Sequence, residues 1–146
     1  MDLQSKARAA LRACGADLPA SPIGLSVMAR TPITGADLFA VPAAGRADVA
    51  RAIDAAHEAF LAWRTVPAPV RGALVKRFGE LVAAHRSDLA DLVGIEVGKI
   101  RSEALGEIQE MVDICDYAVG LSRQLQGRTM PSERPGHRLM ETWHPL

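Results

Sequence analysis

Four acidic side chains in the C-terminal half of the sequence recur at spacings of three and four residues, which would align them on one face of a helix. They are Glu103, Glu107, Glu110 and Asp113. Like charges at this spacing repel each other by about 0.2–0.5 kcal/mol per pair, and a bound cation or a substrate ammonium group would relieve that repulsion. The alternative interpretations are a solvated helix face and partial neutralisation by Arg101 or Arg123.

The other residue types that carry chemistry form no ligand or nucleophile pattern. Cys14 and Cys115 lie far apart, and the four histidines have no short ligand spacing, so we expect neither a disulfide nor a metal site. Cys115 falls on the apolar face of the predicted helix without a neighbouring basic group, which favours a buried structural thiol over a nucleophile. Glycine-rich phosphate motifs, GxSxG and HExxH are absent.

Composition and charge limit the class of protein. The 146 residues are 49% hydrophobic and 23% charged, which is typical of a folded chain. Because 17 basic residues balance 17 acidic ones, we expect no nucleic acid partner. Because the sequence has no long apolar run, we expect no membrane insertion and a cytoplasmic location. Alanine supplies 25 residues and aromatic residues only six, so these faces bury little area and we expect them to pack against something larger.

Periodicity and turn residues predict the elements that position these side chains. A first helix is expected within residues 1–20. Its basic face also fits an organelle transit peptide, but the flanking acids Asp2 and Asp17 favour an ordinary surface helix. Short extended runs at 25–30 and 37–41 then predict a β-hairpin, because proline and glycine separate them.

Four further helices are expected, because apolar residues recur at helical intervals. The first of these is placed at about 47–65, and the second ends at about His85. The third runs from a cap at Ser87 to a stop at Gly98, and the fourth covers about 101–125. The tail predicts a strand from His137 to His144 that reaches the end of the sequence without a partner strand. We therefore expect this strand to pair with another chain or to belong to a longer one.

These segments, in their order and spacing over residues 22–146, resemble the N-terminal region of NAD(P)-dependent aldehyde dehydrogenases. The matching segments are Thr31–Gly35, Asp48–Val49, Ala55–Trp63, Pro67–Arg71 and Glu96–Lys99. Residues 110–123, 132–137 and 141–146 more closely resemble the antiquitin-type branch, the α-aminoadipic semialdehyde (piperideine-6-carboxylate) dehydrogenases.

The resemblance implies an α/β aldehyde-dehydrogenase-like fold of which this chain holds the N-terminal part only. That part comprises an N-terminal β-hairpin, four to five α-helices and a C-terminal oligomerisation β-hairpin. The implied divisions are an N-terminal helix at 1–20, the first part of the cofactor-binding domain at 21–126 and the first part of the oligomerisation hairpin at 127–146. A homo-oligomer contact through residues 129–146 is implied as well.

The resemblance also implies the chemistry. In this family a cysteine thiolate attacks the aldehyde, hydride passes to NAD, and a glutamate activates water. These groups match positions beyond Leu146, so we assign no catalytic, cofactor-binding or metal residue and expect the chain alone to be inactive. Glu110 is the implied substrate-binding residue, which would pair with the ammonium group of a small amino-acid-derived semialdehyde. The alternative is a non-catalytic helical interaction module derived from a truncated dehydrogenase.

Overall fold

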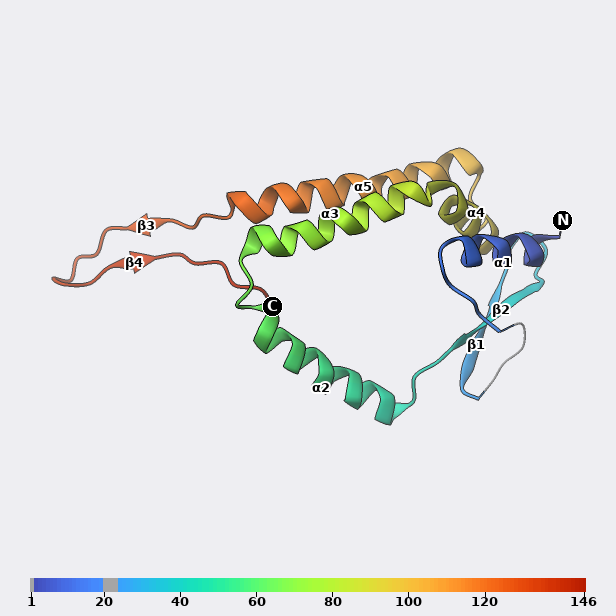
Figure 1. Ribbon diagram of the computed structural model, residues 1–146, viewed down its shortest axis with the longest axis horizontal. Helices are drawn as coiled ribbons and strands as arrows, with labels where there is room; N and C mark the ends of the chain where they lie inside the picture. Colours follow the sequence, from blue (N-terminus) through green and yellow to red (C-terminus); the bar gives the residue numbers. More distant parts are fainter. Residues whose placement is uncertain (1, 20–23) are drawn as a thin grey trace.

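The computed structural model describes residues 2–19 and 24–146, and the boundary expected between residues 20 and 21 lies outside them. The molecule is elongated, with a β-hairpin towards each end (Figure 1). In the described residues one helix precedes the first hairpin, and four helices lie between the two hairpins. The elements are α1 (Leu3–Ala13), β1 (Ser26–Arg30), β2 (Asp37–Pro42), α2 (Arg46–Trp63), α3 (Ala68–Ala84), α4 (Arg86–Val97), α5 (Arg101–Gln124), β3 (Thr129–Met130) and β4 (Leu139–Met140). This order confirms the expected hairpin, helices and second hairpin.

Helix α1 begins at a side-chain cap and packs at one end of the molecule. The carboxylate of Asp2 accepts a hydrogen bond from the backbone N–H of Ser5 at 2.8 Å, which satisfies a donor that the first helical turn leaves free. The helix ends before Gly15, whose φ of +79° suits glycine. Ala7 and Ala10 are buried, and α1 contacts α4 and β2.

The first hairpin pairs β1 with β2 in antiparallel register, with Met28 opposite Ala40. The predicted turn is present: the Thr31 carbonyl accepts from the N–H of Gly35 at 2.8 Å, and the Thr31 N–H donates to Ala36 O at 3.0 Å. Leu38 and Phe39 of β2 form a small core with residues of α1 and α4. The hairpin is therefore held to the rest of the molecule by β2.

Helices α3 and α5 lie side by side along most of their own length (Figure 1). They approach closely because Gly72 and Gly79 of α3 face Ser122 and Cys115 of α5. A Cβ built at Gly72 would lie 2.7 Å from Ser122 Oγ. Cys115 is 7% exposed, which confirms the prediction of a buried cysteine. A second core joins α3, α4 and α5 through Val82, Ala90, Ala104 and Ile108.

Helix α2 stands apart from the α3–α5 pair in Figure 1, and none of its residues is buried. Its apolar stripe predicted the helix correctly, yet Val49, Ile53 and Trp63 are all exposed to solvent. Within the described residues most of the stripe is therefore uncovered, and only Trp63 at its end lines a cavity with α3 and α5. None of the helices in the described part of the chain is both long and apolar enough to cross a membrane.

One prediction about helix ends is wrong. Helix α4 begins at Arg86, directly after α3, so Ser87 lies inside the first turn and does not cap it. Its hydroxyl instead accepts a hydrogen bond from Arg101 Nη2 at 2.8 Å. The predicted stop is confirmed, because Gly98 ends α4 with a φ of +80°.

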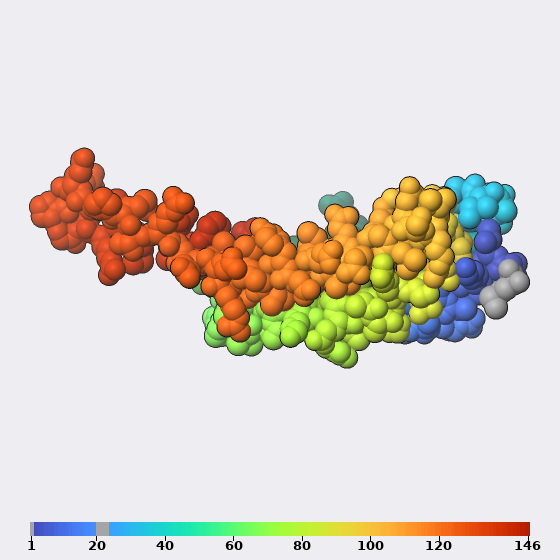
Figure 2. Space-filling view, turned by 90° about the horizontal axis from the view of Figure 1, so that it is seen from above, coloured from blue at the N-terminus to red at the C-terminus, as the bar shows by residue number. Residues whose placement is uncertain are grey.

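The long unpaired strand predicted at the C-terminal end is also wrong. Within this segment only Leu139–Met140 is a strand, and it pairs with Thr129–Met130 of the same chain. Gly136, with a φ of +72°, lies in the turn that reverses the chain. The resulting hairpin projects beyond the end of α5, as the orange and red atoms in Figure 2 show.

Candidate functional site

The four predicted acidic residues lie along α5, and their environments differ. Asp113 accepts a hydrogen bond from Gln109 Nε2 at 2.9 Å. Glu107 forms an ion pair with Lys99, which precedes α5. Glu103 and Glu110 are exposed, and neither forms an ion pair or side-chain hydrogen bond with any residue in 2–19 or 24–146.

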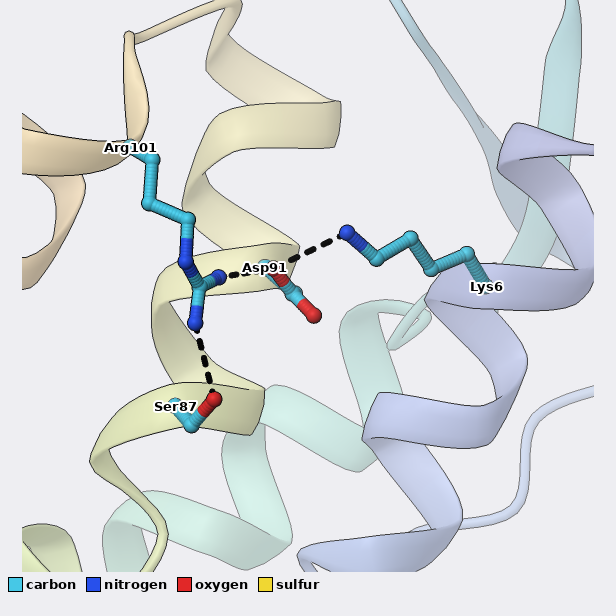
Figure 3. Close-up of polar contacts among 4 residues, drawn as sticks. All are labelled: Lys6, Ser87, Asp91 and Arg101. Atoms are coloured by element: carbon cyan, nitrogen blue, oxygen red, sulfur yellow. Dashed lines mark hydrogen bonds and ion pairs between the residues drawn. The ribbon is translucent and has the colours of Figure 1, made fainter.

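The alternative of partial neutralisation by Arg101 or Arg123 does not hold within the described ranges, because Arg101 pairs with Asp91 of α4 and Arg123 forms no ion pair there. Figure 3 shows Arg101 paired with Asp91, which also accepts from Lys6 Nζ of α1 at 3.1 Å. Asp91 therefore joins three helices through two cations. None of these residues lines the groove that lies between α4 and α5 beside Glu110.

Glu110 lies at a shallow groove of about 430 Å³ between α4 and α5. The groove is lined by Val93, Glu107, Ile108, Glu110, Met111 and Ile114. Its apolar walls include Met111 and Ile114, which are both exposed. An unpaired carboxylate beside exposed aliphatic groups suits a ligand with a short hydrocarbon chain and a positive charge.

Sequence reasoning missed Lys99 as the partner of Glu107. The signal was present, because Lys99 directly follows the helix stop at Gly98 and lies just before the first turn of α5. From that position a lysine side chain can reach along the next helix. Only the structure shows that Glu107, and not Glu103 or Glu110, is the carboxylate that it reaches.

Neither cysteine suits nucleophilic catalysis. Cys115 is buried against Gly79. Cys14 is half-buried, and burial, followed by the nearby negative charge of Asp88, raises the pKa of its thiol. A raised pKa lowers the fraction of thiolate, which is the reactive form.

The described residues offer no metal or dinucleotide site. No group of three or more His, Cys, Asp and Glu side chains within 2–19 and 24–146 could hold a metal ion. A dinucleotide binds a parallel sheet at a glycine-rich turn before a helix, whereas both described sheets are two-stranded and antiparallel. The residues present therefore do not fit NAD, and none is assigned a contact with it.

A larger cavity of about 500 Å³ lies where the start of α3, the end of α5 and residues 143–145 meet. Trp63, Arg71, Leu121 and Trp143 are among its lining residues. No sequence pattern predicted this cavity, since its walls come from segments far apart in the chain. It contains none of the predicted site residues.

Known proteins share both the sequence and the arrangement of these elements. The sequence profile of the aldehyde dehydrogenase family matches residues 24–146. Aldehyde dehydrogenase family 7 member A1 of pea (Pisum sativum) is 46% identical over 123 residues, which are 84% of this chain and 24% of the pea protein. Alpha-aminoadipic semialdehyde dehydrogenase of Bos taurus is 45% identical over 115 residues, covering 79% of this chain and 21% of its own length.

A solved structure has the same fold over the matched region. The NAD-dependent benzaldehyde dehydrogenase of Corynebacterium glutamicum superposes with a TM-score of 0.72 at 27% identity, over 86% of this chain and 27% of that one. The chain thus spans about a quarter of the length of the proteins that it matches.

Proposed function

Because the chain belongs to the aldehyde dehydrogenase family, we propose that it is part of an NAD-dependent enzyme that oxidises an amino-acid-derived semialdehyde of the α-aminoadipic type. The cattle relative, an alpha-aminoadipic semialdehyde dehydrogenase at 45% identity, supports this substrate class. The Corynebacterium relative is an NAD-dependent enzyme, which supports NAD as the cofactor. A role in lysine catabolism and a cytoplasmic location are part of the same proposal.

The observation that carries the substrate proposal is the carboxylate of Glu110 beside the apolar groove, which pairs with no cation in the part of the chain that the structure describes. An α-amino semialdehyde brings an ammonium group that a plain aliphatic aldehyde lacks, and a carboxylate pairs with it through a charge-assisted hydrogen bond. Met111 and Ile114 supply aliphatic surface for the carbon chain of the substrate. Glu110 is therefore a binding residue that holds one end of the substrate.

The remaining chemistry is proposed to come from residues beyond these 146. The nicotinamide of NAD accepts the hydride in this family. Because Cys14 and Cys115 are unsuited as nucleophiles and no described residue fits NAD, we expect the 146-residue chain alone not to reduce NAD. Within the proposed enzyme, 1–20 is an N-terminal helix, 21–126 begins the cofactor-binding domain and 127–146 begins the oligomerisation hairpin.

The projecting hairpin supports an oligomer, proposed as a homotetramer that forms through residues 129–146. Met130, Leu139 and Met140 are 45%, 47% and 54% exposed, which leaves apolar side chains for a second copy to cover. One observation favours the alternative function, a non-catalytic helical module: the apolar stripe of α2 is open to solvent. The coding sequence after Leu146 separates the two proposals: continuation into the rest of a dehydrogenase supports the first, and a stop codon supports the second.

The substrate proposal is tested in the complete enzyme with Glu110→Gln. We expect kcat/KM for α-aminoadipic semialdehyde to fall by about 5- to 150-fold, the effect of about 1–3 kcal/mol for an unpaired charged group, while hexanal oxidation is unchanged. Glu103→Gln is the matched control, since Glu103 is exposed and unpaired on the same helix within the described structure but does not line the groove. Equal losses for the two aldehydes, or equal effects of the two variants, would overturn the proposal.

A further inference from the structure

Two carboxylates border the groove, and one cation distinguishes them. Glu107 and Glu110 are three residues apart on α5, so their Cβ atoms lie about 5–6 Å from each other. Lys99 pairs with Glu107, and no cation among the described residues pairs with Glu110. The groove therefore presents one free negative charge where the sequence supplies two.

The position of Lys99 is restrained by the turn that carries it. Gly98 ends α4 in the left-handed region, where a Cβ would lie 3.0 Å from Cγ of Pro32 in the first hairpin. A Cβ at Gly94 would lie 3.3 Å from the Lys99 carbonyl oxygen. Contacts on both sides thus hold the Lys99 backbone beside the first turns of α5.

We propose that Lys99 is a specificity-determining residue that acts as a built-in counter-cation for Glu107, so that a second positive charge on a ligand gains no additional carboxylate partner in the groove. The proposal rests on the proposed function, in which Glu110 binds a substrate ammonium group. Lys99 itself touches no substrate. It acts through Glu107 by occupying the carboxylate that would otherwise attract a second cation.

The physical basis is charge counting at short range. With Lys99 in place, a diamine gains one carboxylate partner at Glu110, and its second ammonium group meets a carboxylate that is already paired. Without Lys99, both carboxylates are available to one ligand whose ammonium groups are separated by a few methylenes. An exposed ion pair of this kind changes affinity by about two- to fivefold.

The experiment uses the complete enzyme and tests two amines, propylamine and 1,3-diaminopropane, as inhibitors of semialdehyde oxidation. In the wild type we expect similar inhibition constants for the two amines. Lys99→Met should strengthen inhibition by the diamine about two- to fivefold relative to propylamine, without changing kcat for hexanal. Lys99→Arg should restore the wild-type ratio, and Lys76→Met, which removes an exposed lysine of α3 that does not line the groove, should leave it unchanged.

A second variant separates charge selectivity from a folding defect. Adding Glu107→Gln to Lys99→Met should return the diamine-to-propylamine ratio to the wild-type value, which a misfolded enzyme would not do. If Lys99→Met leaves the diamine-to-propylamine ratio unchanged while Glu110→Gln still causes the substrate-selective loss, only the proposed role of Lys99 is overturned. Propylamine inhibition that is insensitive to Glu110→Gln overturns the proposed function as well.

Discussion

Gly79 and Cys115 bring α3 and α5 together, since a Cβ at Gly79 would lie 2.9 Å from the Cβ of Cys115. Gly72 and Ser122 repeat the contact seven residues away on each helix, which is about two helical turns. These contacts fix the rotation of α5 about its axis. Glu110, five residues before Cys115, is thereby turned about 140° away from the α3 contact and toward the groove beside α4.

Gly79→Ala should therefore destabilise the chain. The added methyl group cannot fit against Cys115 without moving α5, and overpacking of this kind costs about 1–3 kcal/mol, more than the gain of about 1 kcal/mol in helix propensity. Gly106→Ala is the matched control, because a Cβ there meets nothing within 4 Å. Urea unfolding followed by circular dichroism should show a lower free energy of unfolding for Gly79→Ala and a higher one for Gly106→Ala. Equal stability of the two variants would contradict the close contact.

Asp91→Asn should loosen α1 from the rest of the molecule. The change removes the negative charge that pairs with both Lys6 and Arg101 (Figure 3). The Asp91 side chain is only 21% exposed. We expect a loss of about 1–2 kcal/mol for two partly exposed pairs, with a smaller loss at high salt. Amide hydrogen exchange in residues 3–13 measures the effect. Asp54→Asn on α2, which has no ion pair in the described structure, should leave this exchange unchanged.

Hydrophobic periodicity predicted which segments are helices, but not which apolar faces are covered. The α5 stripe is buried at Ala104, Ile108 and Cys115 because α3 and α4 lie against it. The equivalent stripe on α2 has the same periodicity in sequence and is exposed at Ile53. Periodicity reports the local preference for a helix, whereas burial depends on what another part of the chain supplies.

For the candidate site too, local helical spacing could be predicted and tertiary contacts could not. Helical spacing placed Glu107 and Glu110 on one helix face, because that spacing is a property of the helix itself. Which charges are neutralised depends on tertiary contacts, so the alternative partner Arg101 pairs with Asp91 instead, and Lys99 was missed. The Ser87 cap failed for a related reason: α3 leads into α4 through His85 alone, and the helix starts before the serine.

Acid should weaken the first turn of α1. The hydrogen bond from the Ser5 backbone, followed by that from the Ser5 hydroxyl, holds the pKa of Asp2 below its ordinary value. Since the pKa is lower in the folded state, the contribution of Asp2 to helix stability is complete above the unfolded pKa. It is lost as the pH falls through the lower, folded value.

Hydrogen exchange of the Ser5 amide, measured between about pH 5 and pH 3 and corrected for intrinsic rates, should show this loss of protection. Asp2→Asn is the control, because asparagine caps helices about as well and does not titrate. The variant should keep its protection over the same range. If acid reduces the protection of the Ser5 amide equally in the wild type and in Asp2→Asn, the assigned cap is contradicted.

Charge on the projecting hairpin should reduce the oligomeric state of the complete enzyme. Leu139 lies opposite Met130 in the β3–β4 pair, and both side chains are nearly half exposed at a site proposed to meet a second copy. Leu139→Asp would bury an unpaired carboxylate in that contact, which is unfavourable by several kcal/mol unless the contact opens. Light scattering after size-exclusion chromatography should give a lower mass for Leu139→Asp. Gln126→Asp is the control, because it adds the same charge at an exposed position between α5 and β3, and it should keep the wild-type mass. If Leu139→Asp also keeps the wild-type mass, the contact between copies lies elsewhere.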